Sequence, residues 1–348
     1  MTKTLSILGM LGCTLLPLVA GCSSTSSSPN TGSPFPDAAT DIGEIAPITF
    51  PRDESPHSDQ IEWWYYTGKL ETAGGNVYGF EQVTFQAMVG GAPIYMGHAA
   101  VTDLANKTYT LDTKMSTIDQ RGASSGFDLD VDGWKMSGHA GNDVLEAAVS
   151  GYGFDLALAA KKPVVLQYGR GWMNIGSTLP FYYYSHTQME ATGTLDIAGS
   201  PTDVTGTAWM DHQWGTMGEY DGWDWFSLRL DDSTEVMLFT VRQKPQNFSG
   251  GTFVDAPGNA QSLTGADFTV MAIDQWTSPH TTSTYPQNWQ ITIPSIGLDA
   301  TVTALLADQE FYKTAGSMPT YWEGLCSISG TKQGNAVGGY AYVELTGY

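Results

Sequence analysis

YSHTQMEATGT, at residues 184–194, aligns without a gap on YWEGLCSISGT, at residues 321–331. The alignment places Gly193 on Gly330, so a glycine stands at the same point of two segments far apart in the chain. Self-similarity of this kind is typical of a repeated structural unit. The simplest account is a duplicated unit of roughly 130–170 residues, whose first copy ends near Gly215.

Two further matches support the duplication. One joins the segments that follow the aligned pair after a loop, and the other, looser match joins the front ends of the two units. The matched segments are 206–211 with 339–344, and 63–66 with 223–226. Each front segment is followed by a turn and an apolar stretch, as expected of two copies of one fold.

Short alternating segments, separated by Gly, Asn and Asp, fill the chain from residue 61 onward. Apolar and polar residues alternate at 77–86, 126–131 and 289–293, as in half-buried strands. The tetrapeptides at 131–134 and 230–233 are typical of hairpin turns, and no long stretch has a helical period. A closed barrel of about eight to ten antiparallel strands fits each unit and removes exposed edges, although two sandwiches fit the periodicity almost as well.

The composition excludes several classes of protein. The 348 residues include 15 Lys and Arg against 36 Asp and Glu, which gives a formal net charge of −21. Nucleic-acid binding requires clustered Lys and Arg for phosphate contacts, so this class is excluded. Charged residues make up only 15% of the chain while aromatic residues and Gly are abundant, which excludes a disordered protein and a coiled coil.

The first residues are typical of an export signal. Lys3 precedes an apolar run at 5–20, which is short for a bilayer span and ends in the lipobox-like sequence LVAGC. We expect removal of residues 1–21 and lipidation of Cys22, the alternative being an ordinary signal with a chance Cys. A flexible Ser- and Pro-rich tether follows at 22–47. The predicted location is the bacterial cell envelope, at the outer membrane in a Gram-negative cell, facing the periplasm or the exterior.

Two folded domains are predicted, at 48–217 and 218–348. Of the three cysteines, Cys13 leaves with the signal and Cys22 is acylated, so Cys326 has no disulfide partner. The stability must therefore come from a hydrophobic core, which about 300 residues can supply.

The junction between the two predicted domains carries a candidate site. Asp211 and His212 end the last strand of the first unit, and the matching strand of the second unit has no His. A carboxylate beside an imidazole sets its tautomer, whereas an Asp211 buried between Trp209 and Trp214 would serve as an acid. We predict Asp211 and His212 as catalytic residues and the two Trp as ligand contacts. A polar network that pins one barrel on the other is the alternative.

Strand alternation places Glu62, Trp64 and Tyr66 on one face, and one face of their strand must line the barrel interior. Glu62 would there be either hydrogen-bonded to its neighbours or a proton donor. His98 lies on a nearly apolar strand, where it is either a satisfied core residue or a ligand contact. We predict that all four residues bind the ligand.

Three formal motifs are set aside. GASSG at 122–126 has the esterase pattern but lies in a loop before a strand, so a serine nucleophile is not expected. DLDVDG at 128–133 resembles the start of a calcium loop, but its twelfth position is His139 rather than Glu. The six His show no metal-ligand spacing. We therefore expect neither a metal nor a cofactor.

EWWYYTG at 62–68, WMDHQWG at 209–215 and YWEG at 321–324, with the terminal ELTGY, resemble the AttH/CrtC family. This double-lipocalin group contains carotenoid 1,2-hydratase (hydroxyneurosporene synthase) and bacterial lipoproteins described as secreted hydrolases. The resemblance implies an all-β fold of two lipocalin-like antiparallel β-barrels packed in tandem, and an apolar, isoprenoid-like ligand. In the hydratases, water is added across a terminal carbon–carbon double bond and an acidic residue supplies the proton. They also use a Tyr and an Asp on a later strand, near 238–242 here, where this chain has no carboxylate.

Three functions are consistent with these features. The first is an envelope-anchored protein that binds a hydrophobic, isoprenoid- or lipid-like molecule. The second is a hydratase-like or cyclase enzyme that uses Asp211 and His212 for acid–base work on an isoprenoid- or polyketide-like substrate. The third is a structural lipoprotein whose barrels are filled by their own side chains. The expected partners are a hydrophobic small molecule and, through the lipid anchor, the membrane; the oligomeric state is not decided by the sequence.

Overall fold

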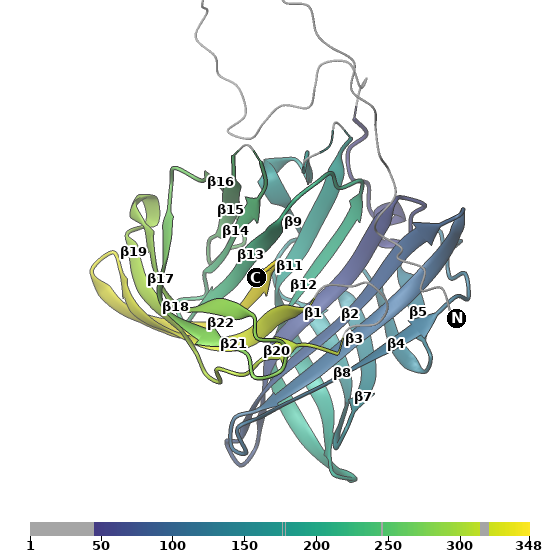
Figure 1. Ribbon diagram of the computed structural model, residues 1–348, viewed down its shortest axis with the longest axis horizontal. Helices are drawn as coiled ribbons and strands as arrows, with labels where there is room; N and C mark the ends of the chain where they lie inside the picture. Colours follow the sequence, from purple (N-terminus) through teal and green to yellow (C-terminus); the bar gives the residue numbers. More distant parts are fainter. Residues whose placement is uncertain (1–44, 176, 178, 245, 314–319) are drawn as a thin grey trace, which may run out of the picture.

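The structure is a computed structural model that describes residues 45–175, 177, 179–244, 246–313 and 320–348. The regular secondary structure of the described chain is nearly all β-strand and forms two antiparallel sheets, one from each half of the sequence (Figure 1). The predicted signal, Cys22 and most of the tether lie outside the described residues. Within the described part, no helix has the length and apolar character needed to cross a membrane.

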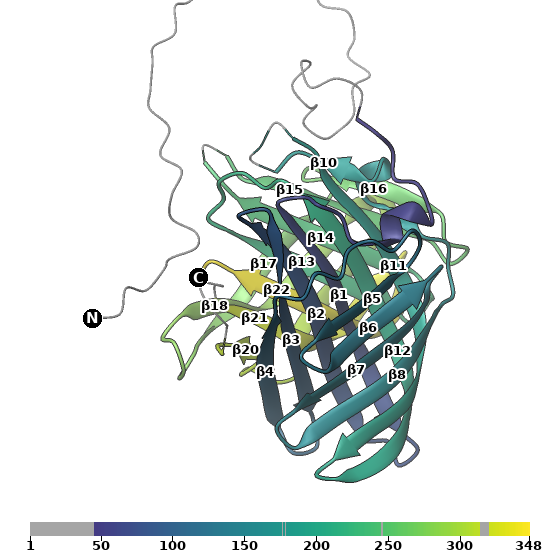
Figure 2. The same ribbon diagram turned by 90° about the vertical axis from the view of Figure 1, so that its right-hand side faces the viewer.

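The N-terminal sheet has the order β4-β3-β2-β1-β12-β11-β8-β7-β6-β5, with β9 and β10 paired to β11. Its strands are β1 (Ile61–Thr72), β2 (Val77–Val89), β3 (Ala92–Asp103), β4 (Thr108–Ser116), β5 (Phe127–Val131), β6 (Trp134–His139), β7 (Asn142–Val149), β8 (Tyr152–Ala160), β9 (Val165–Leu166), β10 (Trp172–Met173), β11 (Phe181–Ile197) and β12 (Ser200–Gly215). The 3-10 helices η1 (Arg52–Glu54) and η2 (Gln167–Gly169) flank them. The edge strands β4 and β5 lie against each other, so the sheet curls into a barrel (Figure 2).

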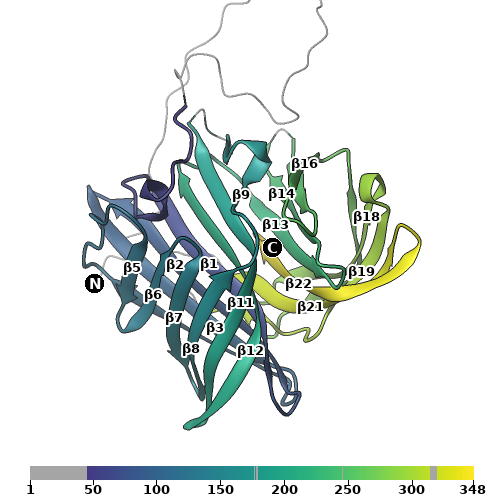
Figure 3. The ribbon, with the colours of Figure 1, turned by 180° about the vertical axis from the view of Figure 1, so that it is seen from behind.

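The C-terminal sheet has the order β16-β15-β14-β13-β22-β21-β19-β18-β17, with β20 paired to β21. Its strands are β13 (Gly222–Leu230), β14 (Glu235–Arg242), β15 (Phe248–Val254), β16 (Ala260–Thr264), β17 (Thr269–Thr277), β18 (Thr284–Ile293), β19 (Leu298–Ala304), β20 (Glu310–Phe311), β21 (Tyr321–Lys332) and β22 (Asn335–Thr346), and the 3-10 helix η3 (Pro294–Ile296) follows β18. Seen from behind, this sheet is a half-barrel beside the first barrel (Figure 3).

Local sequence accounts for many of these elements. The three alternating segments predicted as strands lie within β2, β5 and β18, apart from the first residue of the segment at 126–131. The predicted turn after β5 joins it to β6, and both central residues, Asp132 and Gly133, have positive φ angles of 53° and 85°. Two positive φ angles are typical of a type I′ hairpin turn, in which an Asp-Gly pair is favoured.

The two sheets share one pairing register. Gly206 on β12 pairs with the residue that stands two positions before Gly193 on β11. In the same way, Gly339 on β22 pairs with the residue that stands two positions before Gly330 on β21. A Cβ at any of these four positions would clash with a carbonyl oxygen of an adjacent strand. Glycine is therefore required where strands approach closely, and the matched glycines mark equivalent points of the two copies.

One difference is hidden by the gapless alignment. The pairing of β11 with β12 shifts its register between His186 and Met189, whereas β21 keeps one register with β22 along its length. A bulge of this kind reverses which residues face inward. Tyr184 consequently packs inside the N-terminal barrel, while the residue aligned with it, Tyr321, packs against the N-terminal half from outside.

The described hydrophobic core falls into two interior clusters and a layer between them. Residues such as Trp64 and Tyr66 fill the N-terminal barrel, and residues such as Phe226 and Leu228 fill the concave side of the C-terminal sheet. The layer between the sheets, which we call the seam, includes Trp225 and other side chains from β1, β2, β11, β12, β13, β14, β21 and β22. The seam joins the two halves where β1 and β12 lie beside β21 and β22 (Figure 1).

Candidate functional site

Asp211 and His212 are neighbours on β12, so their side chains point to opposite faces of the barrel wall. The carboxylate of Asp211 accepts hydrogen bonds from seam residues. The side chain of His212 points into the barrel, where its Nε2 lies 2.7 Å from Glu62 Oε1. The predicted Asp–His pair is therefore corrected: the carboxylate that orients the imidazole of His212 belongs to Glu62. Alternation along a strand, which correctly separates Glu62 from Tyr65, also separates Asp211 from His212.

Asp211 is buried in a hydrogen-bond network of the seam. Its carboxylate accepts hydrogen bonds from Tyr183 Oη at 2.6 Å, Ser185 Oγ at 2.5 Å and Trp209 Nε1 at 2.7 Å. Trp225, from the C-terminal half, donates to Tyr183 Oη at 3.1 Å. Burial raises the pKa of Asp211 to about 7 in spite of these donors. Of the two Trp predicted as ligand contacts, Trp209 thus lies in the seam, while Trp214 lies inside the barrel.

Three further buried carboxyl groups lie between the two sheets. Glu81 comes from β2, and Glu323 and Glu344 stand directly opposite each other on β21 and β22. Burial raises the pKa of Glu81 to about 8 and that of Glu344 to about 7. Burial and the neighbouring carboxylates raise the pKa of Glu323 well above its ordinary value. Glu81 and Glu323 therefore favour their protonated forms at neutral pH and Glu344 is about half protonated, because burial penalises the charged form and neighbouring carboxylates add to that penalty.

Each half of the chain supplies a tyrosine to a glutamate of the other half. Tyr65 Oη donates to Glu323 Oε1 at 2.7 Å, and Tyr321 Oη donates to Glu81 Oε1 at 2.7 Å. The ring of His98, stacked on Phe311 at 4.4 Å, places Nδ1 at 2.9 Å from Tyr321 Oη. Burial lowers the pKa of His98 to about 3, so its imidazole is neutral.

Some atoms of this group lack a hydrogen-bond partner within the described chain. They are Glu81 Oε2, Glu323 Oε2, His98 Nε2 and Tyr109 Oη, the last of which is close enough to Glu81 to lower the pKa of that carboxyl group. Buried polar atoms nearly always have a partner, so such atoms indicate a place where a ligand or water completes the bonding. Because His98 Nδ1 faces the hydroxyl of Tyr321, a neutral imidazole with its proton on Nδ1 leaves a free lone pair on Nε2. The seam therefore brings a protonated carboxyl group and a free base together among apolar side chains.

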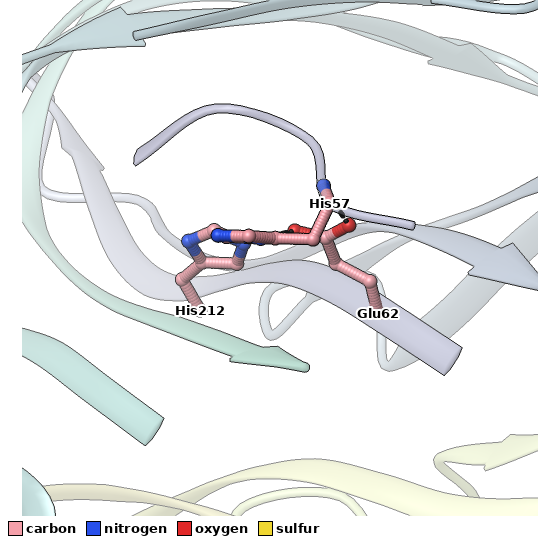
Figure 4. A group of neighbouring side chains, drawn as sticks. All are labelled: His57, Glu62 and His212. Atoms are coloured by element: carbon pink, nitrogen blue, oxygen red, sulfur yellow. Dashed lines mark hydrogen bonds and ion pairs between the residues drawn. The ribbon is translucent and has the colours of Figure 1, made fainter. Parts of the chain in front are cut away.

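A second polar group lies inside the N-terminal barrel. We call it the His–Glu–His cluster, formed by His57, Glu62 and His212 (Figure 4). Both imidazoles approach Glu62 Oε1 at 2.7 Å, and Glu62 Oε2 accepts from the backbone N–H of His57 at 2.7 Å and from Gln86 Nε2 at 3.1 Å. Burial alone would raise the pKa of Glu62, but the hydrogen bonds from His212 and His57 outweigh it and lower that pKa.

Aromatic rings enclose this cluster. Trp64 stacks on His212 with ring centroids 4.5 Å apart, and Trp214 stacks on His57 at 4.3 Å. Tyr66, which shares the inner face of β1 with Glu62 and Trp64, donates instead to Asp143 at 2.8 Å. The predicted face of β1 thus lines the barrel interior, but its three residues contact protein groups there rather than an open calyx.

A narrow crevice lies beside Asp143 and has no room for a water-sized sphere. Its lining includes Glu54, Tyr184 and His186. Burial raises the pKa of Asp143 to about 7 and lowers that of His186 to about 4, and His186 Nδ1 has no partner within the described chain. A crevice of this width does not hold a ligand, since ligand pockets typically enclose roughly 300–1,000 Å³.

Sequence reasoning missed several of these residues. Glu323 and Tyr321 stand in the YWEG motif, and Glu344 was aligned with Asp211, so those signals were present but were not linked to chemistry. Glu81 and His57 carry no local signal, since only the folded chain brings them to Tyr321 and Glu62.

Comparisons with known proteins identify relatives along most of the chain. The AttH-like family matches residues 42–348. The crystal structure of an AttH protein from Nitrosomonas europaea has a TM-score of 0.77 at 29% identity, over 88% of this chain and 98% of that one. Together with the two sheets, this match confirms the predicted all-β fold of tandem lipocalin-like barrels.

Two further relatives are named for reactions that involve water. The crystal structure of kievitone hydratase from Nectria haematococca has a TM-score of 0.74 at 19% identity, over 90% of this chain and 96% of that one, and this likeness concerns the fold. The dehydratase AsqC of Emericella nidulans is 26% identical over 146 residues. That match spans 39% of this chain and 41% of the dehydratase.

Proposed function

This chain belongs to the AttH-like family, and on that premise we propose that it is a hydratase- or dehydratase-type enzyme that binds a hydrophobic small molecule at the seam. The observation that carries the proposal is the pair of unsatisfied atoms on Glu81 and His98, one on a carboxyl group and one on a neutral imidazole. Addition or removal of water requires such an acid and such a base. The names of two relatives, a hydratase and a dehydratase, support the same reaction class.

The proposed dehydration uses both atoms in one step. The proton on Glu81 Oε2 passes to the leaving hydroxyl group of the substrate, the carbon–oxygen bond breaks and water departs. His98 Nε2 takes the proton from the adjacent carbon, whose electron pair forms the double bond. Hydration is the reverse: His98 gives a proton to an alkene carbon while Glu81 takes one from the attacking water.

Tyr321 connects the two groups and allows their charges to be neutralised after the reaction. After dehydration, Glu81 is a carboxylate and His98 an imidazolium. The Nδ1 proton of His98 then passes to Tyr321, whose own proton returns to Glu81, along contacts of 2.9 and 2.7 Å. Both groups thereby become neutral again, with the proton of His98 on Nε2 and that of Glu81 on Oε1. The next turnover then requires proton exchange with water, which returns these protons to Nδ1 and Oε2.

The surroundings support an apolar substrate. The aromatic rings beside His98 are those of Phe85 and Phe311, with centroids 5.3 and 4.4 Å from the imidazole. We therefore infer an isoprenoid- or polyketide-like molecule that carries a hydroxyl group or a double bond. Binding without turnover is the second candidate, and it is favoured by β14, whose seam-facing residues Met237, Phe239 and Val241 bear no carboxylate.

The test measures oxygen exchange with labelled water. The purified protein is incubated in H₂¹⁸O with a panel of isoprenoid and polyketide alkenes and alcohols, and products are followed by mass spectrometry. We expect ¹⁸O to enter the product of at least one alkene, or one alcohol to lose water. Glu81→Gln and His98→Asn should each lower this rate by about 10²–10⁴-fold.

A matched control separates chemistry from folding. Glu310→Gln removes a buried carboxyl group outside the seam, which accepts hydrogen bonds from Ser278, Thr281 and Tyr285. This variant should retain the reaction rate of the unaltered protein. If no compound reacts but one of them is retained and quenches Trp fluorescence, the protein binds without turnover. If Glu81→Gln is as fast as the unaltered protein, the assignment of the acid is wrong.

We also propose that the chain is exported and lipid-anchored in the envelope. The support is the charged start, the apolar run and the LVAGC sequence that ends at Cys22. Cys22→Ser should abolish incorporation of labelled palmitate and release the protein from the membrane fraction. Labelling that persists in this variant would contradict the proposal.

A further inference from the structure

We infer that the His–Glu–His cluster binds a divalent transition-metal ion such as Zn²⁺. One atom from each of three residues, His57 Nδ1, Glu62 Oε1 and His212 Nε2, lies within 4.8 Å of the other two (Figure 4). Two imidazoles and one carboxylate form a donor set that suits zinc, iron, copper or nickel rather than calcium or magnesium. This site lies on the barrel face of β12, opposite the proposed seam site, and does not depend on it.

The groups behind the three donors support a metal site. In metal centres, the second nitrogen of a ligating His usually bonds a carboxylate or another polar group, which fixes the ring orientation. His57 Nε2 lies 3.5 Å from Asp53 Oδ1, and His212 Nδ1 lies 3.1 Å from Tyr184 Oη. Each imidazole therefore has one nitrogen on Glu62 and an outer partner on the other nitrogen.

The carboxylate is held in the same way. Glu62 Oε2 accepts from the backbone N–H of His57 and from Gln86 Nε2, and Tyr95 in turn donates to Gln86 Oε1 at 2.8 Å. Oε1 is left to face the two imidazoles. Glu62 and His212 are fully buried, and the side chain of His57 is 19% exposed, which gives an ion a route from solvent.

Binding requires local proton movements and a small separation of the donor atoms. Both ring nitrogens lie 2.7 Å from Glu62 Oε1, whereas two ligand atoms of a tetrahedral zinc ion lie roughly 3.3 Å apart. Without metal, Glu62 Oε1 accepts a hydrogen bond from each ring. With metal, each ring turns the lone pair of that nitrogen to the ion and carries its proton on the other nitrogen. The proton of His57 then faces Asp53 and that of His212 faces the oxygen of Tyr184, both of which can accept it. Three protein ligands leave a fourth position for water or for an oxygen atom of a small molecule.

The test is titration of the full, metal-free chain with Zn²⁺ by calorimetry and with Co²⁺ by visible absorption. We expect one ion per chain, and Co²⁺ bands typical of a four- or five-coordinate site. His57→Asn should weaken Zn²⁺ binding at least about tenfold, because Asn can still donate to Glu62 but provides no imidazole. Asp53→Asn leaves all three donors in place and should weaken binding by roughly 10–100-fold through the loss of the carboxylate that faces His57.

The matched control is His139→Asn. His139 Nδ1 also lies 2.9 Å from a glutamate oxygen, of Glu54, but outside the cluster. The His139→Asn variant therefore tests for weak binding of Zn²⁺ outside the cluster. It should bind Zn²⁺ with the same affinity as the unaltered protein. Absence of stoichiometric binding to the unaltered chain, or equal affinity in the His57→Asn and His139→Asn variants, would overturn the inference. In that case the cluster is a proton-bonded network that ties the segment before β1 to the barrel.

Discussion

At the scale of single residues, the seam is governed by the cost of burying carboxyl groups close to one another. Glu323 and Glu344 stand opposite each other on paired strands, and both feel the charge of Asp211. The neutral form of each carboxyl relieves this repulsion, and a tyrosine donor satisfies the remaining oxygen of Glu81 and of Glu323. Protonated acids at neutral pH are thus a consequence of where these residues sit.

Glu81→Gln tests this consequence through stability. The folded pKa of Glu81, about 8, lies above its ordinary value of 4.5, so between these values the folded chain holds a proton that the unfolded chain has released. Its contribution to stability is complete below 4.5 and is lost as the pH rises through this window. Gln does not ionise, so the free energy of unfolding of the variant should rise relative to that of the unaltered protein by up to about 1.4 kcal/mol per pH unit in this window. Urea denaturation at pH 5 and pH 8 measures this gain, and parallel pH profiles would contradict it.

Single residues also mark the limit of prediction from sequence. Alternation was sufficient to place Glu62 and Trp64 on one face, which the structure shows to be the inner one, and the same rule separates Asp211 from His212. No rule applied to one segment could bring Glu81 to Tyr321, which is 240 residues away in the chain. Such contacts depend on how two finished sheets pack.

At the scale of elements, the repeat is recorded in glycines and altered by one bulge. The glycines recur because neighbouring backbones leave no room for a Cβ, so the gapless alignment was informative about register. The bulge in β11 is invisible to that alignment, since β21 has the same number of residues between its aligned positions. It turns Tyr184 toward His212 inside the barrel and leaves Tyr183 and Ser185 to bind Asp211 in the seam.

Gly339→Ala tests the role of the repeated glycines. Gly339 has a φ angle of 144°, and a Cβ there would meet the carbonyl oxygen of Arg229 on β13. We expect a loss of about 2–4 kcal/mol in the free energy of unfolding, measured by urea denaturation. Gly74→Ala, in the open β1–β2 turn, is the control and should cost less than about 1 kcal/mol. Equal stability of the two variants would contradict the close-approach argument.

At the scale of the whole molecule, the seam makes one structure of two repeated sheets. Besides the apolar layer, it contains a buried ion pair between Lys162, which follows β8, and Glu235 on β14, with Nζ and Oε2 2.7 Å apart. Tandem barrels could be predicted from the duplication and from family resemblance. The identity of the facing strands could not, because either face of a barrel wall can carry apolar residues.

Lys162→Met tests whether the halves depend on this joint. It leaves the Glu235 carboxylate buried without its cation, and we expect a loss of about 3–5 kcal/mol in the free energy of unfolding. Lys161→Met breaks the neighbouring exposed pair with Glu190 and should cost less than about 1 kcal/mol. Thermal unfolding followed by calorimetry compares the two, and similar midpoints would show that the ion pair is not part of the joint.

The most direct test of the account is the protonation state of the seam carboxyl groups, which infrared spectroscopy reads from the carbonyl band of protonated carboxyl groups. We predict that this band is present at pH 7, declines as the pH rises through about 8, and is smaller in Glu81→Gln. Asp143→Asn removes the separate contribution of the barrel interior, where burial raises the pKa of Asp143 to about 7. A protein whose carboxyl groups are all ionised at pH 6, or a band unchanged by Glu81→Gln, would contradict an acid–base site in the seam.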